Sequence, residues 1–248
     1  MKLNATELFK TLQLEKHEVP AALILEGSWW QQQRNKLRLA KLERVRELPF
    51  PEMYLGFYQD RPVLYSCVYG AARAVEPVHV FASLGSSLAI QIGSCGAIQT
   101  QVHTGDVVLP SLVRIGEGAS QYYGGDDWAS VSTPWLECAK KKLKARGLTT
   151  HTGQFITTSA LFAQPPKLVA GWQHEGHLGV DMETSAVFTA ARAFEMDAVS
   201  MLFAWDELFR NHSFLDPNPS EIEERRERAN LEIFEVALEL AIQAEVKP

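Results

Sequence analysis

Short apolar runs alternate along the 248-residue chain with segments in which apolar residues recur at helical spacing. The first pattern is typical of buried strands and the second of amphipathic helices, so the chain is predicted to form a single α/β domain over residues 1–248. Strands are expected over 22–25, 53–58, 63–68, 88–92, 107–109, 112–115, 150–156, 178–181 and 198–204. Helices are expected within 1–21 and over 28–46, 78–84, 134–146, 183–194 and 220–240, and a loop over 211–219.

The most informative stretch runs from Leu88 to Pro110. Its apolar run, Leu88–Ile92, is followed directly by Gly93-Ser94-Cys95-Gly96, which predicts a buried strand that ends in a tight turn. Glycines let a backbone approach a ligand closely, and a serine hydroxyl beside exposed N–H groups can bind an anion or a polar sugar. An ordinary strand–turn–strand corner would carry the same residues. The spacing matches neither a dinucleotide-binding loop nor a Walker phosphate loop.

Two acidic positions follow other predicted strands. Met182 and Glu183 stand at a strand-to-helix junction, and Asp206 follows the continuous apolar run 198–204. Ligands of α/β proteins bind beyond the carboxyl ends of the strands, and a carboxylate can accept two hydroxyl hydrogen bonds, as a ribose diol requires. Taken alone, Glu183 could also be a first-turn acid favoured by the helix dipole, and Asp206 the first residue of a loop.

Composition excludes several classes of function. The net charge of −6 argues against a nucleic-acid backbone as the main partner. No apolar run is long enough to cross a bilayer, and no signal-peptide core follows the first residues. The three cysteines, Cys67, Cys95 and Cys138, are scattered and form neither a disulfide framework nor a metal knuckle, so a reducing cytoplasm is expected. His174 and His177 have a spacing that suits a metal, but without a third ligand they are expected at the surface.

Three segments carry a resemblance to a known family. Ile92–Ala97 and Gly105–Val108 resemble the central signature of the nucleoside phosphorylase family, which includes purine nucleoside phosphorylases, uridine phosphorylases and nucleosidases. Val180–Ala186 resembles its ribose-binding signature. The resemblance runs from about Pro62 to the C-terminus. It implies a mixed, barrel-like central sheet flanked by helices, no metal or resident cofactor, inorganic phosphate as co-substrate, and a homo-oligomer between dimer and hexamer.

The same resemblance implies roles for individual residues. Met182 and Glu183 would bind ribose, and Asp206 would act as general acid towards the base with help from Arg225, for which Arg226 and Arg228 are neighbouring alternatives. The remaining substrate-binding residues would be Phe162, Ser94, Cys95 and Gly96. The residues that read uracil in uridine-specific members are replaced by Pro166 and Leu168, which favours a purine-like base.

The expected phosphate site departs from the family pattern. Of its first loop only Gly27 is kept, with Glu26 before it and Trp29 after it, and Gln91 replaces an arginine. Phosphate is therefore expected to contact Gly27, Ser94 and Arg73, with Arg34 as an alternative to Arg73. Because an amide cannot replace the charge of a guanidinium, water remains an alternative acceptor. A non-catalytic nucleoside-binding protein and an enzyme with Cys95 as nucleophile are further readings.

Overall fold

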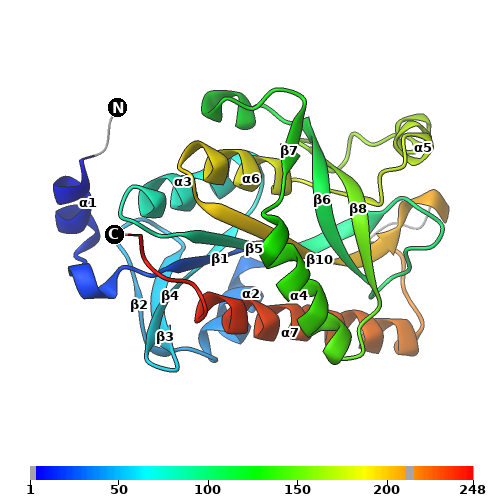
Figure 1. Ribbon diagram of the computed structural model, residues 1–248. Coiled ribbons are helices and arrows are strands. Elements are labelled where there is room, and N and C mark those ends of the chain that lie inside the picture. The colour runs from blue at the N-terminus through cyan, green and yellow to red at the C-terminus, as the bar shows by residue number, and fades with distance from the viewer. Residues whose placement is uncertain (1–3, 211–214, 248) are drawn as a thin grey trace.

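The computed structural model describes residues 4–210 and 215–247, so part of the expected 211–219 loop lies outside the described residues. Within these ranges the strands pair into one mixed ten-stranded sheet (Figure 1). The strands are β1 (Ala22–Gly27), β2 (Glu43–Glu47), β3 (Met53–Tyr58), β4 (Arg61–Val68), β5 (Leu88–Ala97), β6 (Val107–Gly116), β7 (Trp128–Ser130), β8 (Thr150–Thr158), β9 (Gly179–Asp181) and β10 (Asp197–Glu207).

The helices lie on both sides of this sheet. They are α1 (Ala5–Leu12), α2 (Gln31–Leu39), α3 (Ala71–Ala82), α4 (Thr133–Ala145), α5 (Pro166–His174), α6 (Thr184–Ala193) and α7 (Ser220–Ala241), with short 3₁₀ turns η1 (Lys16–Glu18), η2 (Ser120–Tyr123) and η3 (Leu208–Arg210). Across residues 4–210 and 215–247, every helix is too short or too polar to span a bilayer.

Half of the sheet closes on itself. The strand order is β10-β6-β8-β9-β5-β1-β4-β3-β2, and β10 also pairs with β5, so that β5, β10, β6, β8 and β9 form a ring. β1, β5 and β10 run parallel to one another, while β3 and β4 form the expected antiparallel hairpin. The predicted barrel-like mixed sheet is therefore confirmed.

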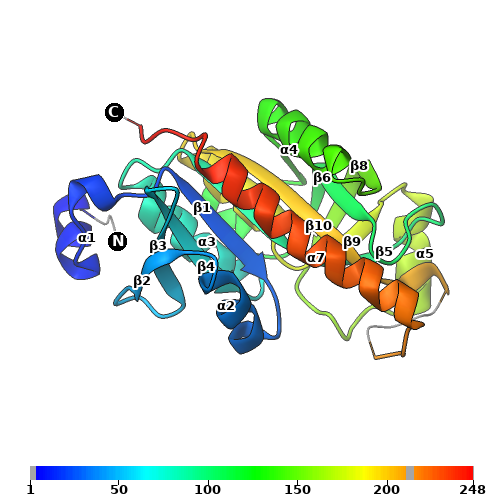
Figure 2. The same cartoon turned by 90° about the horizontal axis from the view of Figure 1, so that it is seen from below.

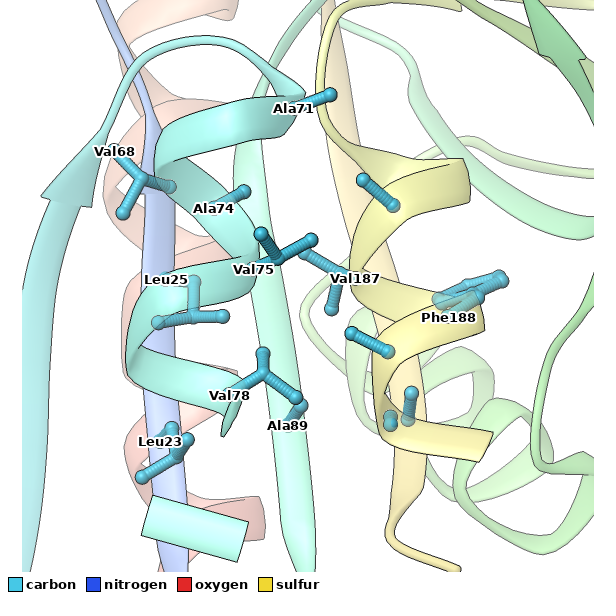
Figure 3. Close-up of a cluster of buried hydrophobic side chains, with 14 of the residues drawn as sticks. Leu23, Leu25, Val68, Ala71, Ala74, Val75, Val78, Ala89, Val187 and Phe188 are labelled. Carbon is cyan, nitrogen blue, oxygen red and sulfur yellow. The ribbon is translucent and has the colours of Figure 1, made fainter. Parts of the chain in front are cut away.

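Two apolar layers hold the sheet between its helices. α3 and α6 pack on one face, where side chains such as Val75 and Val187 meet over Leu25 and Ala89 (Figure 3). α4 and α7 cover the other face, as the view from below shows (Figure 2). Ile233 and Phe234 of α7 are buried in the apolar layer on this face. Because both faces are covered, the central strands read as near-continuous apolar runs.

Several predicted elements differ from the structure, among them the helix expected over 78–84, which begins at Ala71 as α3. The run 88–92 does not end in a turn at Gly93, because β5 continues to Ala97 and Gly93–Gly96 pair with β10. The expected helix 28–46 is limited to α2, since Glu43–Glu47 pair with β3 as an edge strand. The runs 107–109 and 112–115 form one strand, β6, with an irregularity at Pro110. α5 has no counterpart among the predicted helices.

Candidate active site

A cavity of about 350 Å³ opens where β1, β5, β9 and β10 end. The loop after β8 and the segment before α3 complete its wall. It is lined by Gly27, Ser28, Trp29, Trp30, Tyr69, Ser94, Cys95, Gly96, Leu161, Phe162, Gln164, Val180, Asp181, Met182, Glu183, Trp205, Asp206, Leu208 and Leu215. Its volume and its position at the carboxyl ends of parallel strands are those of a small-molecule site.

Glu183 lies at the junction of β9 and α6, with its carboxylate buried in the cavity wall. Its Oε1 accepts a hydrogen bond from the Gly70 backbone N–H at 2.7 Å, and its Oε2 accepts one from Met182 N–H at 3.3 Å. A Cβ atom at Gly27 would come within 2.6 Å of Oε2, so any larger residue there would displace the Glu183 carboxylate. Burial, followed by the charge of Asp181, raises the pKa of Glu183 to about 8.

A buried polar network supports Glu183 from behind. Asp181 accepts hydrogen bonds from Thr157 Oγ1 at 2.7 Å and from the Thr184 backbone N–H at 3.0 Å. Gln91 is fully buried in this network, donating to Asp181 and accepting from Thr184. Burial raises the pKa of Asp181 to about 6, against the lowering effect of these hydrogen bonds. Gln91 therefore orders the wall of the site and does not face its interior.

Asp206 lies at the end of β10 and is buried against β5. Its Oδ1 would be 3.2 Å from a Cβ atom at Gly96. The pairing register with β5 shifts between Ala204 and Asp206, so Trp205 is the extra residue of a bulge. Bulges of this kind redirect side chains near active sites, and here both Trp205 and Asp206 line the cavity.

The residues of β5 that were predicted to bind substrate are brought together as expected. Ser94, Cys95 and Gly96 all line the cavity, although they do so from a strand and not from an anion-binding turn. Burial, and then the charges of Asp181 and Asp206, raise the pKa of the Cys95 thiol well above its ordinary value. A thiol in this state is a poor nucleophile, which disfavours the reading of Cys95 as a catalytic nucleophile.

Aromatic side chains form much of the remaining wall. Trp30 stacks on Trp205 with ring centroids 5.0 Å apart, and Trp29 stacks on Tyr69 at 6.0 Å. Phe162 lies 5.5 Å from Trp29. These rings connect the side of the cavity that holds Glu183 with the side that holds Asp206, and Phe162 lies at the cavity as predicted.

The arginines expected at the site lie elsewhere. Arg73 pairs with Glu76 and the Pro51 carbonyl, and it does not line the cavity, which corrects the phosphate-binding prediction. Arg225 does not line the cavity either, because it is held by Asp106. The alternative Arg226 lies closer, with its guanidinium 3.9 Å from the Trp205 ring centroid.

Two further arginines form ion pairs with Glu26 and do not line the cavity. The Glu26 carboxylate accepts two hydrogen bonds from Arg38, each at 2.9 Å, and lies 3.5 Å from Arg34 Nε. Both arginines are largely buried in these ion pairs, so Arg34 does not replace Arg73. Glu26 is thus neutralised beneath the cavity and does not confront a bound ligand.

His177 also departs from its predicted place at the surface. It is fully buried, and its Nε2 lies 3.1 Å from Glu175. Desolvation lowers its pKa, so the neutral ring is favoured. No group of three or more metal-binding side chains occurs in the part of the chain that the structure describes.

Several cavity residues were not predicted from the sequence. Trp29 and Trp30 were expected within the helix 28–46 and were given no part in binding, and Tyr69, Gln164 and Asp181 were not singled out. One signal was available for the tryptophans, since they come directly after the end of a predicted strand, where ligands of α/β folds bind. Tyr69 and Gln164 are brought to the cavity by long-range packing, which local pattern does not reveal.

The comparison with known proteins agrees with this geometry. A model of the phosphorylase superfamily matches residues 31–241. The chain belongs to the phosphorylase superfamily. The matched range includes the segments that carry β5, β9, α6, β10 and α7, and it begins well before Pro62, so the sequence resemblance was drawn too short. It leaves out Gly27, Trp29 and Trp30, the part of the cavity in which this superfamily member departs most from the expected pattern.

Relatives of this superfamily member carry enzyme names. DeoD-type purine nucleoside phosphorylase from Alkaliphilus metalliredigens is 27% identical over 210 residues, which cover 82% of this chain and 86% of the relative. The same enzyme from Caldanaerobacter subterraneus is 25% identical over 195 residues, covering 76% and 80%. The predicted membership in the nucleoside phosphorylase family, and with it the prediction of an enzyme, is confirmed at this level.

A solved structure confirms the fold. Uridine phosphorylase from Vibrio fischeri superimposes with a TM-score of 0.79 at 20% sequence identity, covering 93% of this chain and 95% of the other. At 20% identity, this similarity shows that the two proteins share a fold and shows nothing further. The ring of strands with helices on both sides is thus shared with a nucleoside phosphorylase.

Proposed function

We propose that the chain cleaves the N-glycosidic bond of a purine-like nucleoside. One observation carries the proposal: Met182 and Glu183, from the junction of β9 and α6, line the same cavity as Asp206 from the end of β10. A sugar-binding carboxylate and a base-facing carboxyl on opposite strands of one ring are the arrangement that this reaction needs. The missing uracil-reading residues at Pro166 and Leu168 support a purine-like base.

Each side chain has a definite task in this reaction. Glu183 accepts hydrogen bonds from the ribose hydroxyls, and the Met182 side chain supplies an adaptable apolar surface for the sugar. As the bond breaks, positive charge grows at C1′ and the bonding electrons pass to the base nitrogen. Asp206 stabilises the leaving base by sharing or donating a proton. The aromatic rings, Phe162 among them, stack on the base.

Phosphate is the acceptor that the relatives' names favour. Gly27 and Ser94 are the groups of this chain that would contact it at the cavity. In the described part of the chain no lysine, arginine or histidine lines the cavity. We therefore propose that a second copy supplies positive charge, in a homo-oligomer between dimer and hexamer. The unpaired cysteines suit a cytoplasmic enzyme.

Water is the second candidate acceptor, and the same lining supports it. A phosphate dianion would share the cavity with three carboxyl groups, those of Asp181, Glu183 and Asp206, without a cation from the described residues. A neutral water molecule meets no such repulsion. In that case the products are free base and free ribose.

The deciding experiment is a panel of purine and pyrimidine nucleosides, assayed with and without phosphate, with base and sugar products quantified. Base release that requires phosphate and yields pentose 1-phosphate supports phosphorolysis, and equal release with free ribose supports hydrolysis. Glu183→Gln and Asp206→Asn should each lower kcat/KM by roughly 100-fold or more. Asp60→Asn, at a highly exposed position, is the control.

The proposal has a clear point of failure. If Glu183→Gln and Asp206→Asn both keep full turnover, these residues do not perform the reaction. If every nucleoside binds without product, the chain is a nucleoside-binding protein and not a catalyst.

A further inference from the structure

The position of Asp206 in the cavity depends on the bulge in β10. Ala204 pairs with Cys95 of β5. The next residue of β5, Gly96, pairs with Asp206, so Trp205 is inserted between the two pairs. Successive side chains of a strand point to opposite faces, and a register change of one residue moves a side chain to the other face. Without the bulge, Trp205 would take the position opposite Gly96, and Asp206 would point to the other face.

The backbone alone does not fix the extra residue of this bulge. A bulge interrupts the ladder of backbone hydrogen bonds and leaves its extra residue unpaired. The side chain of Trp205 makes no hydrogen bond that could replace the ladder, because its buried Nε1 has no partner within residues 4–210 and 215–247. The conformation of the bulge therefore depends on what the Trp205 ring packs against.

Two groups make close contacts with the Trp205 ring. Trp30 stacks on it, with ring centroids 5.0 Å apart and the planes 15° from parallel. The Arg226 guanidinium lies 3.9 Å from its centroid and also pairs with Glu223. The Phe203 ring is farther away, at 5.9 Å, and is tilted by 43°. Stacked rings and a cation over a ring are favourable contacts, so Trp30 and Arg226 hold the indole in place.

Trp30 is itself held firmly, directly before the first residue of α2. Its backbone N–H donates a hydrogen bond to Ser28 Oγ at 3.2 Å, and its carbonyl accepts one from the Arg34 backbone N–H at 3.0 Å. The Arg34 side chain is paired in turn with the buried Glu26. The stacking ring therefore projects from a backbone that is fixed to the start of a helix.

We propose that Trp30 is a positioning residue, which stabilises the bulge of β10 by stacking on Trp205 and so directs Asp206 into the cavity. The inference rests on the proposed function, in which Asp206 stabilises the leaving base. Trp30 acts through Trp205 and not through a contact with the substrate. It lies just outside the range that the superfamily model matches, residues 31–241, so the family match gives it no role.

Substitution of Trp30 in the full chain tests the inference. Trp30→Leu removes the ring face but keeps an apolar side chain, whereas Trp30→Phe keeps a ring. With the nucleoside that the panel identifies, Trp30→Leu should lower kcat about tenfold to hundredfold and change KM less than about threefold. Trp30→Phe should retain most of the activity. An unchanged kcat in Trp30→Leu, or a rise in KM alone, would overturn the inference.

A matched control separates this effect from the general loss of a tryptophan. Trp135 of α4 is half-buried and does not line the cavity, and its Nε1 donates a hydrogen bond to Asp197 at 3.1 Å. Trp135→Leu should keep the kinetics of the parent chain. An equal fall of kcat in Trp135→Leu would mean that the loss in Trp30→Leu is not specific to the bulge, and would overturn the inference.

A double-variant cycle shows whether Trp30 acts through Asp206. In a chain that already carries Asp206→Asn, Trp30→Leu should change kcat by less than about twofold, because the carboxyl group that it positions is absent. If the two losses multiply instead, Trp30 acts independently of Asp206 and the inference is wrong.

Crystal structures of the parent chain and of Trp30→Leu give a test that needs no turnover. The variant should show a reoriented Trp205 ring and an Asp206 carboxyl group that has left the cavity wall. If both residues keep their positions, the inference fails, even where nucleosides are cleaved and the proposed function stands. If both residues move and the parent chain cleaves no nucleoside, the positioning by Trp30 is supported and the proposed function fails.

Discussion

Glu183 shows how the surroundings of one side chain set its charge. Its carboxylate is held by two backbone N–H groups, yet burial and the neighbouring Asp181 outweigh them and favour the protonated form. Two carboxyl groups that share a buried wall cannot both ionise easily. The pair is therefore sensitive to any charge that enters the cavity.

The raised pKa of Glu183 predicts a pH dependence of stability. Its pKa is about 8 in the folded chain, against an ordinary value of 4.5. Because the folded chain keeps a proton that the unfolded chain releases, the stabilisation is complete below the ordinary pKa and is lost as pH rises through the folded value. The melting temperature should therefore fall between about pH 5 and about pH 8, and this fall should be smaller in Glu183→Gln.

Thermal unfolding at constant ionic strength checks this prediction. Glu245→Gln, at a position that is 79% exposed in its side chain, is the matched control and should keep the fall of the parent chain. Parallel curves for the parent and Glu183→Gln would mean that Glu183 is ionised throughout this range.

At the scale of single elements, the second turn of α7 presents two adjacent arginines to different surroundings. Arg226 lies over Trp205 at the cavity wall, while Arg225 is held by the buried Asp106. Adjacent helical positions point in different directions, so the choice between them follows from the orientation of α7. That orientation is set by packing and not by the local sequence.

This difference predicts separate effects of two substitutions. Arg226→Ala should lower kcat/KM for the substrate found in the panel by about tenfold, because Trp205 loses the cation that holds its ring. Arg225→Ala should leave the kinetics near those of the parent and lower the free energy of unfolding by about 1 kcal/mol or less, since this arginine is partly exposed. Steady-state kinetics and urea unfolding measure the two effects. The opposite pattern would return the catalytic role to Arg225.

The central strand shows why local pattern failed at one element. Glycines at 93 and 96 indicated a turn, but β5 continues through them because neighbouring strands and side chains approach closely. A Cβ atom at Gly93 would lie 2.7 Å from the Gly27 carbonyl oxygen, and one at Gly96 would lie 2.6 Å from Leu208. The glycines thus serve packing between elements distant in sequence, which sequence pattern alone does not distinguish from a turn.

At the scale of the whole molecule, one buried ion pair connects three parts of the fold. Arg38 of α2 donates to Glu26 of β1 and also to the Asn230 carbonyl and side chain of α7. Tyr65 of β4 donates to the same Glu26 carboxylate at 2.9 Å. The network thus joins β1, whose end lies at the cavity, to α7, which covers one face of the sheet.

Breaking this network should destabilise the whole chain. Arg38→Ala leaves the Glu26 carboxylate with a much weaker set of partners in a buried position, and should lower the free energy of unfolding by about 3–5 kcal/mol. Arg44→Ala, at an ion pair whose arginine side chain is 56% exposed, should cost less than about 1 kcal/mol. Urea unfolding of both variants checks the contrast, and similar costs would contradict it.

The sequence predicted the fold better than the walls of the site. Apolar runs placed most strands and helices, and resemblance supplied Met182, Glu183 and Asp206, which the structure gathers at one cavity. The sequence pattern could not reveal which arginines form ion pairs with buried acidic residues, as Arg38 does with Glu26. It also could not show that aromatic residues from four separate segments meet, because such contacts depend on the closed ring.

The topology of the sheet also bears on how copies of the chain behave in concentrated solution. At one end the sheet closes into the ring. At the other end β2 is an edge strand, which pairs with β3 on one side and leaves its other side unpaired in the strand order. Unpaired strand margins invite aggregation, and charged side chains discourage it. β2 reads Glu43-Arg44-Val45-Arg46-Glu47 and is almost wholly exposed, with a glutamate at each end and an arginine on either side of the central valine. An intruding strand would have to strip water from these charges, so the margin protects the folded chain from stacking into fibres.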